Sequence, residues 1–361
     1  MKVSLNKEKN LDGISVYKRY TGKKIMIALI LLVLVFILSI FAINAGSTNL
    51  KPYQILMSIF GQGSDISNVV IWRIRLPRVL AAIIAGTGLS VAGCVMQNNL
   101  RNPLASPSTL GITNAAAFGA SLAIVIFDAG SIRSTNADAV IINNPYIVAI
   151  SAFICAMIAT LVILMLAKLR GLLPESIVLA GVALGSLFSA GTTLIQYFAQ
   201  DVQVAATVFW TFGDLGRASW NEIFIMAFIV GLSLIYFMFR RWDYNALDSG
   251  EESAKSLGVN VKRVRFEGML VSCIITAVTV SFLGTIGFIG LIGPQIVRRI
   301  TGGDHRFLIP ISALMGSLLL LIADTMARTI IAPVILPVGA ITSFLGAPLF
   351  LYLLLRGYKT R

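Results

Sequence analysis

Charged residues are scarce in this sequence, where they make up 12% of 361 positions. A soluble domain carries about twice that share. Hydrophobic residues reach 57% and the mean hydropathy is +0.86, so an integral membrane protein is expected. The net charge of +13 then reports orientation, because lysine and arginine concentrate on the cytoplasmic side of a membrane. No nucleic acid partner is expected.

Histidine and cysteine are also rare. The single histidine, His305, excludes a metal site built from several imidazoles. Cys94, Cys155 and Cys273 all fall inside apolar runs, so a disulfide framework is not expected. Neither a metal nor a cofactor is expected.

Motifs of nucleotide-binding and catalytic sites are missing as well. No GxxxxGK followed by Ser or Thr occurs, so this chain does not bind ATP through a P-loop. HExxH and GxSxG are absent, and no pair of carboxylates faces across adjacent predicted spans. The chain is therefore expected not to be an enzyme.

Long apolar runs dominate what the sequence does contain. A membrane-spanning helix needs about 20 such residues. Glycine recurs at every third position before Pro294, which favours a sharp turn and then a half-span. Ten helical stretches are expected to cross or enter the membrane: 25–43, 76–97, 110–127, 146–166, 176–198, 223–239, 266–283, 290–300, 307–331 and 339–355.

These runs predict an all-α integral membrane protein with about ten transmembrane helices. One transmembrane domain covers 25–356, between an amino-terminal tail, 1–24, and a carboxyl-terminal tail, 357–361. Ten spans place both tails on one side, and most of the 29 lysines and arginines fall there. The sequence therefore predicts that both termini are cytoplasmic.

A polar island, 240–265, separates two of the apolar runs and is called the coupling loop below. Ser249 and Glu252 have the spacing of a capping box, and Gly258 is a suitable residue to follow a helix end. We expect a short helix, Gly250–Leu257, with Ala254 and Leu257 on one face. The island is either a solvated connection between spans or a docking element for a cytoplasmic partner.

Three patterns within or beside the spans have both a structural and a functional interpretation. Gly181 and Gly185 form a GxxxG pattern, which lets helices approach closely, either inside one subunit or along an interface or pathway. Asp324 and Arg328 are four residues apart, which favours a structural ion pair. An ion-coupled carrier would need more acidic groups at mid-membrane.

Arg75 and Arg78 flank Pro77 at the predicted outer end of the second span, which we expect to start near Leu76. They either anchor the helix end by snorkelling or form an exposed cationic patch for an acidic partner.

Several motifs, in unbroken order from about Arg73 to Arg356, resemble the permeases of iron-siderophore, haem and vitamin B12 ABC importers. The motifs are Arg75-Leu-Pro-Arg78, Gly93 to Gln97, Arg101-Asn-Pro-Leu-Ala105, Leu179-Ala-Gly-Val-Ala-Leu-Gly185, Trp210 to Gly213, Gly250 to Gly258, Gly287 to Arg298, Gly303-Asp-His-Arg306, Ala323 to Arg328 and Leu336 to Gly346. Gln295 and Leu336 depart from the pattern, which usually has His and Glu there.

The resemblance implies one half of a type II importer. Its partners would be a second permease subunit, identical or paralogous, two cytoplasmic ABC ATPases, an external binding protein and the lipid of a bacterial cytoplasmic membrane. It also implies that the second helix is long and starts before Pro77. The expected cargo is an iron(III)–siderophore chelate; haem or a corrinoid is the alternative, and an ion-coupled secondary transporter is a distant one.

The resemblance assigns three groups of site residues. ATPase coupling falls to Ser249, Gly250, Glu251, Glu252, Ala254, Leu257 and Gly258. Docking of the binding protein falls to Arg75, Arg78 and Arg328. The translocation path and inner gate fall to Leu173, Pro174, Glu175, Ser176, Gly181 and Gly185.

Overall fold

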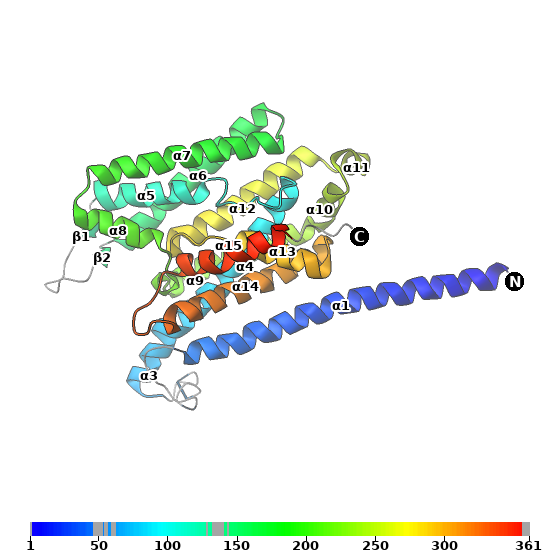
Figure 1. Cartoon of the computed structure of the whole chain (residues 1–361), viewed down its shortest axis with the longest axis horizontal. Helices are drawn as coiled ribbons and strands as arrows, with labels where there is room; N and C mark the ends of the chain where they lie inside the picture. Colours follow the sequence, from blue (N-terminus) through cyan, green and yellow to red (C-terminus); the bar gives the residue numbers. More distant parts are fainter. Residues whose placement is uncertain are drawn as a thin grey trace.

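The computed structural model describes residues 2–45, 53, 57–58, 63–127, 129–131, 141–142 and 144–355. The expected carboxyl-terminal tail, 357–361, lies outside them. Figure 1 shows a bundle of long helices whose axes run roughly side by side, with the start of α1 projecting beyond it. Two short antiparallel strands, β1 (Gly130–Ser131) and β2 (Ile141–Ile142), connect α5 to α6.

The described helices follow the predicted spans. They are α1 (Lys2–Asn44), α3 (Asp65–Val69), η1 (Val70–Arg75), α4 (Leu76–Asn99), α5 (Ile112–Ile126), α6 (Pro145–Leu169), α7 (Pro174–Tyr197), α8 (Asp201–Thr211), η2 (Leu215–Arg217), α9 (Trp220–Phe239), α10 (Arg241–Asp248), α11 (Glu251–Ser256), α12 (Val261–Leu283), α13 (Ile289–Thr301), α14 (His305–Thr329) and α15 (Val338–Leu355).

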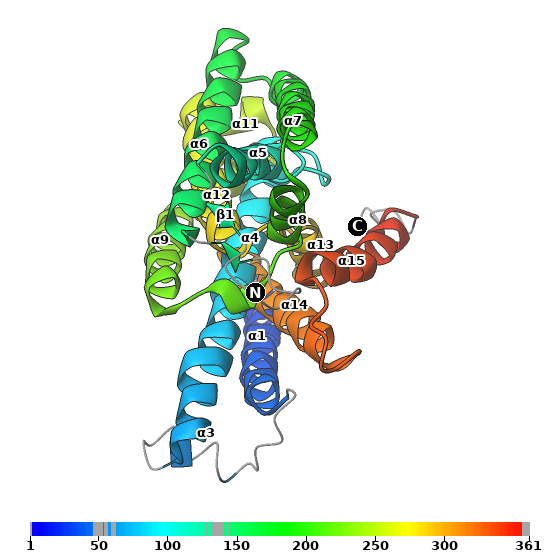
Figure 2. The same ribbon diagram turned by 90° about the vertical axis from the view of Figure 1, so that its left-hand side faces the viewer.

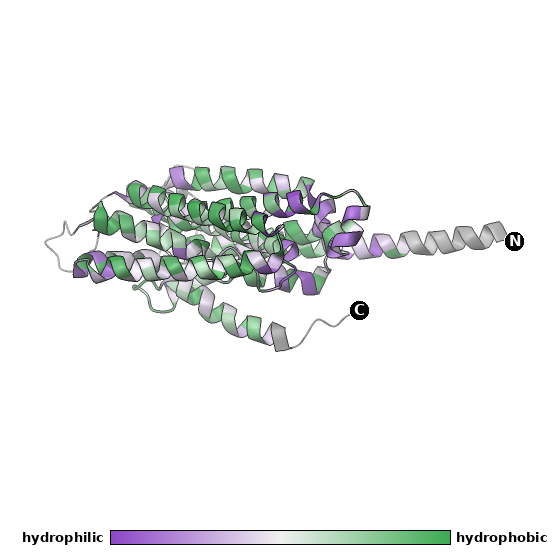
Figure 3. Ribbon diagram, turned by 90° about the horizontal axis from the view of Figure 1, so that it is seen from above, coloured by the Kyte–Doolittle hydropathy of each residue, from purple (hydrophilic) through white to green (hydrophobic). Residues whose placement is uncertain are grey.

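Seven helical segments of the described chain are long and apolar enough to cross a membrane. The shorter apolar helices α5 and α15 and the half-length α13 occupy the other three predicted positions. The prediction of an all-α protein with about ten membrane helices is confirmed. Figure 3 shows why this fold suits a bilayer, because hydrophobic residues cover its middle and hydrophilic residues gather toward its ends.

The amino-terminal segment differs from the polar tail that was expected. Helix α1 has 43 residues, so it is about 65 Å long at 1.5 Å per residue. The hydrocarbon core of a bilayer is about 30 Å thick. The helix continues through the polar and the apolar part of this segment because no proline interrupts it, and its start projects beyond the other helices (Figure 1).

The second span also starts earlier than Leu76. A continuous helical segment runs from Asp65 to Asn99, which confirms the long helix implied by the family resemblance. Pro77 has no N–H, so an α-helical bond to the carbonyl four residues earlier is lost. The preceding turn widens, and the N–H of Leu76 bonds to the carbonyl of Ile71, five residues back.

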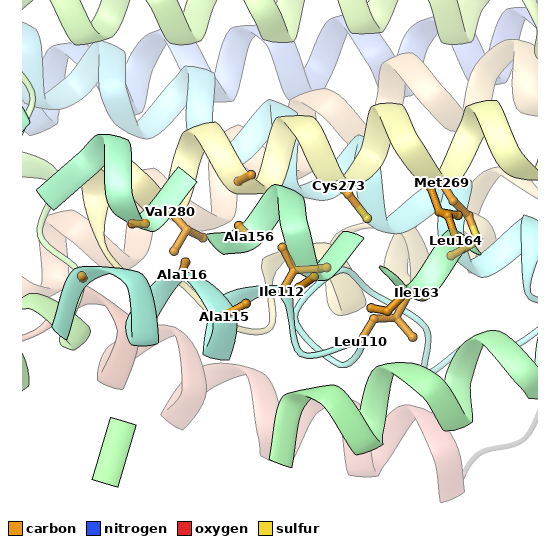
Figure 4. Packing of buried hydrophobic residues seen from close by; sticks show 14 of the residues in the cluster. Leu110, Ile112, Ala115, Ala116, Ala156, Ile163, Leu164, Met269, Cys273 and Val280 are labelled. Carbon is orange, nitrogen blue, oxygen red and sulfur yellow. The ribbon is translucent and has the colours of Figure 1, made fainter. Parts of the chain in front are cut away.

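Helix α4 forms the centre of the bundle and contacts its neighbours through glycine. A Cβ on Gly93 would lie 1.8 Å from the carbonyl oxygen of Gly290 in α13, and one on Gly86 would lie 2.4 Å from that of Gly316 in α14. Side chains of any size are therefore excluded there, and the backbones touch. An adjoining apolar cluster joins α5, α6 and α12, and Ala156 of α6 and Cys273 of α12 both belong to it (Figure 4).

Candidate functional site

The coupling loop contains two short helices rather than the single one predicted. Helix α11, Glu251–Ser256, is one residue shorter at each end than the expected Gly250–Leu257. The predicted capping box does not form, because Ser249 ends α10 and its hydroxyl donates to the carbonyl of Asn245 at 3.4 Å. Gly250 begins α11 with φ of +121°, a conformation that glycine reaches at little cost.

The end of α11 has the capping structure that Gly258 predicts. Gly258 has φ of +81°, its N–H donates to the carbonyl of Lys255, and the N–H of Val259 donates to that of Ala254. These two bonds make a Schellman motif. The coupling loop therefore holds a helix closed at its carboxyl end, which fixes the direction of α11 relative to α12.

Ala254 and Leu257 were expected to share a docking face, but they point to different surroundings. Ala254 is fully buried against the bundle, whereas Leu257 is 71% exposed. The outer surface of α11 therefore includes Leu257, the almost fully exposed Glu252 and the exposed Lys255. This outer surface can meet a partner, and Ala254 attaches the helix to its own subunit.

Arg265, in the first turns of α12, attaches α11 to the rest of the protein. Its side chain is 2% exposed. Nε donates to the carbonyl of Asn99 at 2.9 Å, Nη1 donates to the carbonyl of Leu172 at 2.8 Å, and Nη2 pairs with Glu251. One guanidinium thus joins α11, the end of α4 and the chain that enters α7.

A second set of bonds attaches α10 to the end of α4. Asn98 donates to the carboxylate of Asp248 at 2.6 Å, and Arg101 donates to the carbonyl of Leu247 at 3.0 Å. Partial burial raises the pKa of Asp248, although Arg298 and Asn98 favour its charged form. In contrast, the bond from Arg265 lowers the pKa of Glu251, so the Glu251 carboxylate is charged at neutral pH.

The expected inner gate begins directly after Leu172. Leu172 has φ of +61°, Leu173 is 51% exposed, and α7 starts at Pro174. Pro174 and Glu175 line a hollow of about 620 Å³ together with the loop that follows α4. Ser176 is half-buried in the first turn of α7. The structure therefore brings the predicted gate to the same end of the bundle as α11.

Gly181 and Gly185 bring α7 close to the start of α5. A Cβ on Gly181 would lie 2.9 Å from the Cα of Leu110, and one on Gly185 would lie 3.1 Å from the Cα of Gly111. The pattern thus serves helix packing inside the subunit. The same glycines also line a groove of about 550 Å³ whose other lining residues are uncharged: Ser108, Thr109, Gly111, Asn114, Val182, Ser186, Ser189, Ala190 and Thr193.

At the opposite end of the bundle, Asp324 joins two arginines. Arg328 Nε lies 3.0 Å from one carboxylate oxygen, as the four-residue spacing predicts, and Arg78 Nε lies 2.7 Å from the other. Arg78 also pairs with Asp214 at 3.1 Å. We call Arg78, Asp214, Asp324 and Arg328 the outer ion cluster.

Arg75 and Arg328 bind the end of α1. Arg75 donates to the carbonyl of Ile43 at 2.7 Å, and Arg328 donates to those of Ala42 and Ala45 at 3.0 and 2.8 Å. A helix end leaves its last carbonyls without intrahelical partners, and cations stabilise its partial negative charge. The two side chains therefore attach the carboxyl end of α1 to α4 and α14.

Of the two interpretations of Arg75 and Arg78, the exposed cationic patch is not what the structure shows. Arg75, Arg78 and Arg328 are 4, 5 and 9% exposed, because carboxylates and helix carbonyls within the subunit hold them. Arg73 is the exposed arginine nearby. A role in docking a binding protein stays a prediction for the three.

Sequence reasoning missed Arg265, Asn99 and Leu172. Arg265 is the last residue of the polar island, and its position next to an apolar run is a signal of a buried cation. Gln295, recognised only as a departure, donates to Gln97 at 2.9 Å and to the carbonyl of Pro103 at 3.2 Å. It therefore ties α13 to α4 and to the loop after α4.

The model of the FecCD transport family matches residues 31–356. The chain belongs to this family. An ABC transporter permease protein of Methanocaldococcus jannaschii is 62% identical over 95% of this chain and 98% of its own length. A Fe(3+)-citrate import permease of Bacillus subtilis is 35% identical over 93% and 96%, and a hemin transport permease of Yersinia pestis is 35% identical over 92% and 96%.

A solved structure of a metal-chelate type ABC transporter, in an inward-facing conformation, has a similar fold. It superposes with a TM-score of 0.78 at 28% identity, over 92% of this chain and all of that one. Together with the membrane helices, these similarities identify this FecCD protein as a membrane-embedded permease of an ABC importer.

Proposed function

We propose that this FecCD permease passes an iron(III)–siderophore chelate across the cytoplasmic membrane. The observation that carries the proposal is the groove between α5 and α7, whose lining residues include hydroxyl and amide groups but no charge. Such a surface can hydrogen-bond to an oxygen-rich chelate without holding it by ion pairing. The names of the Bacillus and Yersinia relatives support iron chelates and make haem the alternative; a corrinoid is a second one.

A second permease subunit, identical or paralogous, would complete the path. Helix α7 leaves large apolar side chains exposed, including Leu179 at 73% and Leu187 at 64%. Helices α7 and α15 lie at the same edge of the bundle (Figure 2). A partner subunit against this edge would enclose the groove, with Leu173–Ser176 as its inner gate.

Two ATPase subunits would bind at the coupling loop. The exposed surface of α11 supplies Glu252, Lys255 and Leu257, and the Schellman motif at its carboxyl end keeps this helix in one direction. ATP binding closes the ATPases and displaces α11, which moves the gate. Both termini of the permease would lie on this cytoplasmic side.

An external binding protein would dock at the opposite end, around the outer ends of α4 and α14. There the exposed Arg73 is suited to meet an acidic partner, since exposed charges mainly raise association rates. Arg75, Arg78 and Arg328 would support that surface by fixing the helix ends beneath it.

The test is uptake into proteoliposomes that contain the permease with its ATPase and binding protein. Ferric citrate, a ferric hydroxamate, hemin and cyanocobalamin are offered in turn, with ATP inside. We expect ATP-dependent uptake of an iron chelate that persists when a protonophore collapses the proton gradient. Uptake of hemin or cyanocobalamin alone would support the alternative cargo, and uptake that follows the proton gradient without ATP would contradict the ABC mechanism.

A further inference from the structure

We propose that Arg265 is a positioning residue that links the ATPase-docking helix α11 to Leu172, the residue directly before the inner gate. The inference rests on the proposed function, and it adds the physical connection between α11, where the ATPase would bind, and the start of α7, where the gate lies. Three segments that are distant in sequence meet at this one side chain.

The guanidinium group is suited to this task because its donors point in fixed, coplanar directions. Nε and Nη1 bind two backbone carbonyls, those of Asn99 and Leu172, while Nη2 binds the carboxylate of Glu251. Backbone carbonyls move only when their segment moves. A displacement of Glu251 is thus passed to the main chain beside the gate rather than to a freely rotating side chain.

Burial makes this connection stiff. Arg265 is 2% exposed, so water cannot readily replace a lost partner, and a buried cation without its carboxylate is strongly unfavourable. When α11 moves, Arg265 must follow Glu251 or lose its charged partner. The positive φ of Leu172 and of Gly171 before it marks a turn, where a pull on the carbonyl of Leu172 changes the direction in which α7 starts.

Arg263 offers a matched comparison on the same helix. It pairs with Glu267 at 2.7 Å, but its side chain is 68% exposed. It bonds to Glu267 on α12 and to Asn260 at the cap of that helix, and neither belongs to α7. A replacement of Arg263 therefore changes an arginine of α12 without cutting the connection to the gate.

The experiment follows the gate directly and needs no transport substrate. Cys94, Cys155 and Cys273 are replaced by alanine, and Leu173→Cys introduces a thiol at the gate. The permease is purified with its co-expressed ATPase in proteoliposomes, and the rate of thiol labelling is measured without nucleotide and after trapping with ATP and vanadate. Arg265→Lys, Glu251→Gln and Arg263→Lys are compared in this background, and ATP hydrolysis is measured in each.

We expect the labelling rate of the reporter protein to change by about fivefold or more on trapping, as an allosteric coupling does. Arg265→Lys, which keeps the charge but not the three directed bonds, should reduce this change to less than twofold while ATP hydrolysis continues. Glu251→Gln, which weakens only the α11 side, should give an intermediate change. Arg263→Lys should match the reporter protein.

An unchanged labelling response in both Arg265→Lys and Glu251→Gln would overturn the link. If Arg265→Lys does not assemble, Glu251→Gln decides, because Glu251 is at the surface of the subunit and its replacement leaves both carbonyl bonds in place. Failure of the proposed function looks different: the reporter protein itself would then bind no ATPase or show no response to nucleotide.

Discussion

Arg78 Nε lies 2.7 Å from a carboxylate oxygen of Asp324, although 246 positions separate the two residues in the chain. Asp324 is fully buried and also receives Arg328. The outer ends of α4 and α14 are therefore held by a carboxylate that two cations share, and a third bond from Arg78 leads to Asp214 near the surface. These two ion pairs explain why an acidic residue is tolerated inside a membrane helix.

Replacement of Asp324 should destabilise the permease. Asp324→Asn leaves the buried guanidinium of Arg328 without its carboxylate and leaves Arg78 with Asp214 alone, so we expect a loss of about 3–5 kcal/mol in the free energy of unfolding. Thermal unfolding in detergent measures the effect. Asp201→Asn, an exposed carboxylate at the start of α8, is the control and should cost no more than about 1 kcal/mol. Equal effects of the two changes would show that the outer ion cluster does not stabilise the fold.

The closest backbone contacts predict which glycines are indispensable. Gly93→Ala places a Cβ 1.8 Å from a backbone oxygen, so α4 and α13 must separate, and we expect little folded protein in the membrane. Gly231→Ala on α9 is the control, since a Cβ there meets nothing within 4 Å, and replacing a helix glycine should be neutral or stabilise by about 0.5–1 kcal/mol. Fluorescence-detected size-exclusion chromatography compares the two; a normal monodisperse peak for Gly93→Ala would contradict the contact.

Asp304 makes the free energy of unfolding depend on pH in the acidic range. Burial alone would raise the pKa of the Asp304 carboxyl. Hydrogen bonds from Arg306 and Asn245 have the larger, opposite effect, so the pKa is lowered to about 2. The unfolded carboxyl titrates near pH 4, so the folded state binds fewer protons between these values. The stabilisation is therefore complete above about pH 4 and is lost as the pH falls toward 2.

Asp304→Asn, which keeps an oxygen that can cap α14, should remove this part of the pH dependence. We expect a loss of about 1–2 kcal/mol at pH 7, discounted for partial exposure, and a smaller difference from the unsubstituted protein as the pH approaches 2. Unfolding curves at several pH values provide the measurement, and a difference that grows on acidification would contradict the assignment.

The two apolar residues of α11 should respond differently to a charge. Leu257→Asp changes an exposed contact surface, so the permease should fold normally but lose binding of its ATPase and ATP-driven uptake. Ala254→Asp buries a charge inside the subunit and should lower the amount of folded permease. Co-purification of the ATPase together with membrane levels separates the outcomes. If Leu257→Asp retains its ATPase and transports normally, α11 is a connection and no docking element.

Thiol labelling on α11 tests which side of the membrane this end of the bundle faces. Ser253 is exposed, and Ser253→Cys in a cysteine-free background should react with a membrane-impermeant thiol reagent only after the cytoplasmic face is opened. Labelling in intact cells would reverse the proposed topology. Thr193→Cys, on the groove-lining face of α7, serves as a comparison of a membrane-embedded position with a loop position.

The sequence predicted those features that depend on neighbours along the chain. Ten spans followed from the length of apolar runs, the half-span α13 from repeated glycine, the cap at Gly258 from its position after α11, and the Asp324–Arg328 pair from the helix repeat. Each of these features depends on residues of a single helix and on the medium around it, so the local order of residues determines it.

Features that need two distant elements were not predictable in this way. The bonds from Arg265 to Leu172 and from Arg78 to Asp324 exist because packing brings separate helices together. The capping box at Ser249 failed because the residues before it form α10, which takes Ser249 as its own end. Arg75 and Arg78 lie inside the subunit rather than in an exposed patch because the carbonyl of Ile43 binds Arg75 and two carboxylates bind Arg78.

The glycine contacts of α4 also determine which part of the permease can move. Where backbone touches backbone at Gly86–Gly316 and Gly93–Gly290, no side-chain rotation can absorb a shift, so α4, α13 and α14 must be displaced together as one body. Helix α7 has close glycine contacts with the start of α5, at Gly181 and Gly185, but it is less enclosed: 17% of its apolar stretch is buried inside the subunit, against 78% for the segment containing α4. Transport would then consist of a mobile wall, α7, turning on the loop at Leu172 against a fixed frame centred on α4.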